Sequence, residues 1–207
     1  MKTVLFQGDS ITDVGRSRDN DSNRGLGYPH LISAQLGYDC PGAYNLINRG
    51  VSGDRVVDLY ARIKRDFINL APDYMSILIG VNDVWHEIGS QNGVDADKYE
   101  RVYGMLIEEI LEKVPQVKIM ILEPFVTHGT ATEANWEIFS TEVPKRAAAA
   151  GRVAEKYGLK FVPLQARFDE AITKAPAEYW TADGVHPTAF GHELITRAWL
   201  EAFAEIQ

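Results

Sequence analysis

The chain has 207 residues, 45% of them hydrophobic and 24% charged, which is ordinary for a globular protein with a substantial core. Its formal net charge of −8 argues against a general affinity for nucleic acid or an anionic membrane, so neither is expected as a partner. The single cysteine, Cys40, excludes an internal disulfide and a cysteine-rich zinc site, which fits a reducing compartment.

The first residues lead directly into structural sequence. Met1 to Thr3 precede an apolar run, Val4 to Phe6, that is typical of a first strand and leaves no room for a cleavable signal peptide. No apolar stretch approaches the roughly 20 residues needed to cross a bilayer. We therefore expect a cytoplasmic protein.

Short apolar runs then alternate with stretches of helical periodicity. Further strands are predicted at 44–47, 74–79, 118–122 and 160–162. Helices are predicted at 28–36, 56–67, 99–114 and 143–157, with a last one capped by Thr188, while 16–27 and 87–96 are expected to be surface loops. With no linker or repeat, this alternation predicts one α/β domain over residues 1–207. Its mostly parallel five-stranded sheet is covered by helices on both faces.

Residues able to do chemistry collect just after the predicted strands. Ser10, in Gly8-Asp9-Ser10, follows the first strand; Gly53 follows the second and Asn82 the third. The carboxyl ends of parallel strands form the edge at which such sheets bind ligands. A serine in a tight turn at this edge can act as a nucleophile, with nearby backbone N–H groups facing the negative charge that develops.

A serine nucleophile also needs a base and a group that orients the base. His186 is the candidate base, because Pro187 biases it away from helical dihedrals and lets its ring project from a loop. Asp183, three residues earlier, can accept a hydrogen bond from Nδ1 and leave Nε2 for the serine proton. The alternative is that Asp183 only closes a turn and that His186 is incidental.

The other histidines are weaker candidates. His30 and His192 lie in predicted helices, where surface or packing roles are expected. His128 fits a solvated loop that could touch substrate. His86, close to Asn82, is a candidate for the rim of the site.

Four segments together resemble the sequence blocks of the SGNH (GDSL-type) hydrolase family. They are Gly8-Asp9-Ser10, Gly53 within 51–54, Asn82 within 80–83, and the segment 183–187, and they occur in the family order. The resemblance implies a three-layer α/β/α flavodoxin-like fold and a Ser10-His186-Asp183 triad. It also implies an oxyanion hole made by the backbone N–H groups of Ser10 and Gly53 and the side-chain amide of Asn82. No cofactor or metal is implied.

The segments 8–16, 79–85 and 185–188 are further similar to intracellular acetylxylan esterases of this superfamily. This resemblance implies a homo-oligomeric serine esterase for short acyl esters, above all acetyl esters of xylo-oligosaccharides, acting through an acyl-enzyme. Trp85 and Trp180 lie beside the catalytic blocks, where they could stack on a sugar ring or simply pack the loops. Lysophospholipase, thioesterase and arylesterase activities are alternatives within the superfamily.

Two functions of other classes are also considered. Asp9, Asp13, Asp54 and Asp83 could bind Mg²⁺ for phosphoryl transfer, but no phosphate-binding loop accompanies them. A non-catalytic carbohydrate-binding module would account for exposed aromatic residues. It would not account for a serine, an asparagine, an aspartate and a histidine placed together.

Overall fold

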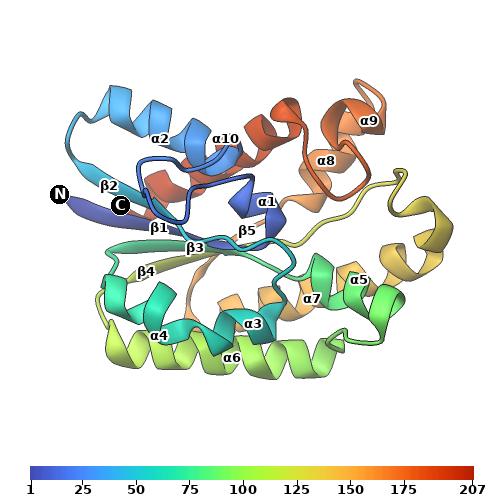
Figure 1. The fold of residues 1–207 in the computed structure, drawn as a ribbon, viewed down its shortest axis with the longest axis horizontal. Helices are drawn as coiled ribbons and strands as arrows, with labels where there is room; N and C mark the ends of the chain where they lie inside the picture. Colours follow the sequence, from blue (N-terminus) through green and yellow to red (C-terminus); the bar gives the residue numbers. More distant parts are fainter.

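The computed structural model describes residues 1–207 and contains a five-stranded parallel sheet between two layers of helices (Figure 1). The strand order is β2-β1-β3-β4-β5, which is the flavodoxin-like order. All five predicted strands are confirmed, and every neighbouring pair is parallel. The strands are β1 (Lys2–Gly8), β2 (Tyr44–Asn48), β3 (Tyr74–Leu78), β4 (Lys118–Leu122) and β5 (Lys160–Val162).

Alternate residues of each strand face opposite helix layers. In β1, Val4 and Phe6 belong to one buried core and Leu5 belongs to the other. The first core is covered chiefly by α2 (Tyr28–Asp39), α8 (Gln165–Ile172) and α10 (Ala189–Ile206). The second core is covered by α3 (Val56–Ala61), α6 (Ala96–Lys113) and the C-terminal half of α7 (Trp136–Tyr157). Because both faces are buried, the strands are apolar on both sides.

Three predicted segments differ in the structure. The helix predicted over 56–67 is interrupted at Arg62 and continues as α4 (Ile63–Asp66). The loop predicted over 87–96 is helical to Ser90, as the end of α5 (Val81–Ser90). Helix α7 begins at Trp136 rather than at residue 143, and Pro144 lies inside it. Proline favours the first turn of a helix, so its position misleads a sequence-based estimate of where the helix starts.

The remaining elements are short. They are α1 (Ser10–Asp13), α9 (Ala177–Trp180), and the 3-10 turns η1 (Ile68–Leu70) and η2 (Glu133–Asn135). Helices α5 and α9 lie on the right of Figure 1, and α1, which directly follows β1, lies near its middle. None of the helices combines the length and the apolarity that crossing a membrane requires.

Candidate active site

Ser10 lies on a sharp turn between a strand and a helix. Strand β1 ends at Gly8, and Ser10 is the first residue of α1. The Asp9 side chain caps this helix by accepting a hydrogen bond from the Ile11 N–H at 3.0 Å. The N–H groups in the first turn of a helix have no partner within the helix. The turn therefore presents the Ser10 hydroxyl and its N–H at the carboxyl edge of the sheet.

A chain of two hydrogen bonds joins Ser10, His186 and Asp183. The Ser10 Oγ lies 2.9 Å from His186 Nε2, and His186 Nδ1 lies 2.7 Å from Asp183 Oδ2. The other Asp183 oxygen accepts from the N–H groups of Val185 and His186. Burial alone would raise the pKa of Asp183, but these hydrogen bonds outweigh it and lower the pKa. An ionised Asp183 favours a proton on Nδ1, which leaves Nε2 free to accept the Ser10 proton.

The histidine loop, residues 181–187, is supported by backbone hydrogen bonds from the segment after β4. The Thr127 N–H donates to the carbonyl of Gly184 at 2.8 Å, and the Ala131 N–H donates to the carbonyl of Asp183 at 2.9 Å. These bonds use main-chain groups on both sides. The Thr127 hydroxyl adds side-chain contacts, at 2.6 Å from the Thr181 hydroxyl and 3.3 Å from the carbonyl of Gly184.

The predicted oxyanion residues lie next to Ser10, around an open cavity of about 510 Å³. Gly53 has a φ of 86°, a left-handed conformation that glycine adopts without strain. The Asn82 Nδ2 donates to the carbonyl of Asp54 at 3.1 Å, which orients the amide and leaves its second hydrogen free. The cavity is lined by Ser10, Ser52, Gly53, Asn82, Trp85, His86, Gly89, Ser90 and His186.

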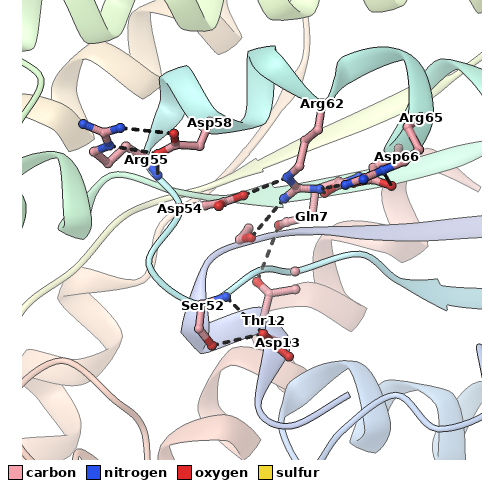
Figure 2. A network of polar contacts seen from close by, with 12 residues as sticks. Gln7, Thr12, Asp13, Ser52, Asp54, Arg55, Asp58, Arg62, Arg65 and Asp66 are labelled. Carbon is pink, nitrogen blue, oxygen red and sulfur yellow. Dashed lines mark hydrogen bonds and ion pairs between the residues drawn. The ribbon is translucent and has the colours of Figure 1, made fainter. Parts of the chain in front are cut away.

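Arg62 connects the loop that carries Gly53 to the end of β1 (Figure 2). Its Nε donates to Asp54 Oδ2 at 2.7 Å, and its Nη1 donates to Gln7 Oε1 at 3.0 Å and to Asp66 Oδ2 at 3.2 Å. Its Nη2 lies 3.4 Å from the carbonyl of Gly8. The side chains of Arg62 and Asp54 are only 10% and 13% exposed. One largely buried guanidinium thus links the residue beside Gly53 to the strand that leads to Ser10.

The other side of the same loop is held by Asp13. Its Oδ2 accepts from the N–H and the hydroxyl of Ser52, both at 3.0 Å, and from Arg18 at 2.6 Å (Figure 2 shows the Ser52 contacts). Burial alone would raise the pKa of Asp13, but the hydrogen bonds from Ser52 and Arg18 lower it. The Gly53 loop, residues 49–55, is therefore fixed by charged side chains on both sides.

Two further carboxyl groups near the site are buried. Burial raises the pKa of Asp9 to about 7, although the Ile11 N–H and His186 act against the rise. Burial also raises the pKa of Asp83 well above its usual range, and both Asp83 oxygens face the Val56 N–H at 3.2 and 3.3 Å.

The four aspartates considered for Mg²⁺ do not form a group that could hold a metal ion. Asp13 is instead paired with Arg18, and Asp54 with Arg62. The geometry thus lends no support to the phosphoryl-transfer alternative.

Of the two tryptophans predicted to lie at the site, only one lines the cavity. Trp85 lines the cavity, and its ring centroid lies 5.9 Å from that of His186. Trp180 does not line it: its indole N–H donates to the carbonyl of Ala175, and its ring packs against the first core. Trp180 therefore has the packing role that was the alternative at the sequence level.

The remaining histidines occupy different environments in the structure. His86 lines the cavity. His128 packs edge-on against Trp136 and lines a different cavity. His192 is buried, and its Nδ1 accepts from the Tyr28 N–H at 3.2 Å, which is a packing role.

Sequence reasoning did not identify two features of the site. One is Arg62, which in a helical pattern looks like any solvent-facing arginine. The other is the face of α5 that includes Gly89 and Ser90. A helical spacing from Asn82 onward was available as a signal for this face, but residues 87–96 were predicted to be a loop.

Comparisons with known proteins agree with this geometry. Residues 6–194 match the GDSL-like Lipase/Acylhydrolase family. An acetylxylan esterase from Geobacillus stearothermophilus is 33% identical over 95% of this chain and 91% of its own length. The crystal structure of Axe2, an acetylxylan esterase from the same organism, superposes with a TM-score of 0.87 over 97% of this chain and 93% of the esterase, at 31% identity. Variants of that esterase with a serine or an aspartate replaced by alanine are described as catalytic mutants.

A GDSL-like lipase candidate from Parabacteroides merdae has a TM-score of 0.91 and 36% identity over 98% of this chain and 95% of its own. The fold and these matches show that the chain belongs to the GDSL-like lipase/acylhydrolase family. It is a carboxylic-ester hydrolase.

Proposed function

We propose that this hydrolase removes acetyl groups from xylo-oligosaccharides, with Ser10 as nucleophile, His186 as base and Asp183 as the carboxylate that orients the base. The observation that carries the proposal is the hydrogen-bonded chain Ser10-His186-Asp183 at a cavity with polar walls. The similarity to an acetylxylan esterase over nearly the whole chain supports the same substrate class.

In the first half-reaction, Ser10 Oγ attacks the acetyl carbonyl carbon while His186 Nε2 takes the hydroxyl proton. The negative charge that develops on the carbonyl oxygen is stabilised by the N–H groups of Ser10 and Gly53 and by the free amide hydrogen of Asn82. The tetrahedral intermediate collapses when His186 gives its proton to the sugar oxygen. The carbohydrate leaves as an alcohol, and the acetyl group stays on Ser10.

In the second half-reaction, water takes the place of the alcohol. His186 Nε2 removes a proton from the water as it attacks the acetyl carbon, and the same donors stabilise the second oxyanion. The bond to Ser10 Oγ then breaks, His186 returns the proton to Ser10, and acetate is released. Throughout, ionised Asp183 stabilises the imidazolium that forms at His186.

The lining of the cavity favours a small acyl group over a long one. Its only large apolar side chain is Trp85; the rest are serines, glycines, an asparagine and two histidines. A long acyl chain would find almost no apolar surface here, so it would not gain the roughly 0.8 kcal/mol that burial gives for each CH₂. This argues against the lysophospholipase alternative.

The proposal is tested by mass spectrometry of acetylated xylo-oligosaccharides before and after incubation with the enzyme. We expect loss of acetyl groups with the enzyme and none with the Ser10→Ala variant. Persistence of every acetyl group would reject the substrate, while turnover by Ser10→Ala would reject the nucleophile. A parallel assay compares acetyl with octanoyl esters of one alcohol, and faster octanoyl hydrolysis would contradict the small acyl site.

Two predictions from the sequence stand beside this proposal. The homo-oligomeric state is measured by light scattering during size-exclusion chromatography, and a monomeric mass would contradict it. The cytoplasmic location is checked by cell fractionation.

A further inference from the structure

One face of helix α5 forms a wall of the active-site cavity. Five of its residues line the cavity, and their spacing of three, one, three and one places them along a single stripe of the helix: Asn82, Trp85, His86, Gly89 and Ser90. The stripe begins beside Ser10 at the buried end of α5 and runs outward for about 12 Å at 1.5 Å per residue. It is longer than an acetyl group requires.

The chemistry indicates which part of the substrate meets this wall. His186 must donate its proton to the departing alcohol oxygen, so the alcohol lies next to the His186 ring when it leaves. Trp85 is the wall residue beside that ring, with 5.9 Å between the two centroids. The wall beyond Trp85 therefore borders the alcohol rather than the acyl group.

Gly89 leaves this wall open where a side chain would narrow it. Gly89 is the exposed penultimate residue of α5, and a glycine costs up to about 1 kcal/mol relative to alanine within a helix. Here no packing contact requires it, because a Cβ added at Gly89 would meet no atom within 4 Å. Its backbone is helical, so no left-handed conformation requires it either. The missing side chain instead adds to the space of the cavity.

We propose that the stripe formed by Trp85, His86, Gly89 and Ser90 binds the alcohol part of the ester, and that Gly89 makes room for an alcohol with a ring. The carbohydrate identity of that alcohol rests on the proposed function; the position of the wall does not. The half-buried His86 ring offers a hydrogen-bond donor and an acceptor for sugar hydroxyls. The indole of Trp85 offers an apolar face to a pyranose ring.

The test replaces Gly89 by leucine and varies the alcohol at a constant acetyl group. We expect Gly89→Leu to lose about tenfold or more in kcat/KM for acetylated xylotriose and for 1-naphthyl acetate, mainly through KM. Hydrolysis of ethyl acetate should change by less than about twofold, because its alcohol does not reach Gly89. Leucine is a better helix former than glycine, so the variant should fold at least as stably, which thermal unfolding checks.

A matched control is Gly37→Leu in α2, where an added Cβ also meets no atom within 4 Å and which does not line the cavity. It should leave all three esters unaffected. As a second arm, His86→Ala should raise KM for acetylated xylotriose about fivefold with kcat retained. The loss on ethyl acetate should be smaller than on acetylated xylotriose, because the ethyl group carries no hydroxyl for the His86 ring to bind.

An equal loss on all esters, or no loss on any, would overturn the proposed wall. Failure of the wild-type enzyme to deacetylate xylotriose would instead reject the proposed function. The comparison of naphthyl with ethyl acetate would still test the wall.

Discussion

The two loops on either side of Ser10 differ in how much charged side chains contribute to holding them in place. On the proton-transfer side, backbone hydrogen bonds from Thr127 and Ala131 hold the histidine loop. On the oxyanion side, the Gly53 loop has backbone bonds to β1, such as Val51 N–H to the Gly8 carbonyl, but it is also held by charged side chains, above all Arg62 and Asp13. A backbone hydrogen bond loses no partner when a side chain is truncated, whereas a largely buried ion pair is broken by a single truncation. The oxyanion side should therefore be the more sensitive of the two to substitutions outside the cavity.

The largest effect should come from the residue that both sides share. Ser10→Ala removes the proposed nucleophile, and we expect kcat for an acetyl ester to fall by about 10⁶ with the thermal unfolding midpoint nearly unchanged. A fluorophosphonate probe should label the wild-type enzyme at one site and leave the variant unlabelled. Labelling of the variant would place the nucleophile elsewhere.

On the oxyanion side, Asn82→Ala removes the donor that its contact with Asp54 orients. We expect a loss of about 10²–10³ in kcat with KM little changed, because the donor acts mainly on the charge of the transition state. Steady-state kinetics on an acetyl ester measure this split, with the exposed Asn69→Ala as the control. A rise in KM at constant kcat would assign Asn82 to substrate binding instead.

Between the two sides lies Asp9, whose pKa of about 7 is affected by both His186 and Asp54. Since the folded protein binds this proton more tightly than the unfolded chain does, Asp9 lowers stability progressively as pH rises from about 4 to 7. The Asp9→Asn variant keeps an acceptor for the Ile11 N–H without the charge. Relative to wild type, its free energy of unfolding should rise by about 3 kcal/mol between pH 5 and pH 8. Urea unfolding at both pH values measures this, and parallel pH dependences would contradict it.

Arg62 does not line the cavity, so replacing it tests whether the oxyanion side is sensitive to a substitution outside the cavity. Arg62→Met frees Asp54 from the end of β1, and we expect kcat per folded molecule to fall between about 10- and 100-fold through misplaced oxyanion donors. In the double variant with Asn82→Ala, the two losses should not multiply, because Arg62 acts through the same donors. The control is Arg65→Met: this exposed arginine also pairs with Asp66 but does not bind Asp54. Equal losses in both arginine variants would make the role of Arg62 merely structural.

The smallest effect should be on the proton-transfer side. Thr127→Val removes a hydroxyl that lies 2.6 Å from the Thr181 hydroxyl and 3.3 Å from the carbonyl of Gly184, but it keeps the backbone bond from the Thr127 N–H to that carbonyl. We expect kcat to stay within about threefold and stability to fall by about 1 kcal/mol. Kinetics and thermal unfolding measure both quantities. A loss as large as that of Arg62→Met would remove the contrast between the two sides.

The parts of this molecule that follow from local patterns could be predicted from the sequence. The five strands are short apolar runs because both faces of the sheet are buried. Ser10, Gly53 and Asn82 come together because the carboxyl ends of parallel strands share one edge. Asp183 and His186 are only three residues apart, so the hydrogen bond between their side chains depends on local structure.

The parts that depend on long-range pairing could not be predicted. Arg62 acts on the site only because the helix breaks at that residue and because β1 lies beside it in space. Neither condition is visible in a run of alternating charged and apolar residues. Trp180 stands next to the catalytic motif in sequence, but its own hydrogen bond to Ala175 turns it toward the core.

The distance along the chain between the two hydrogen-bonded partners has a consequence for biosynthesis. Ser10 and His186 are 176 residues apart in sequence. A ribosome must therefore have released the chain past residue 186 before the hydroxyl can meet its proposed base, and such non-local closure is slow compared with helix formation. Esterase activity thus reports on the last stage of folding, when the chain's first strand and final loop have come together. A nascent chain stays catalytically silent until then.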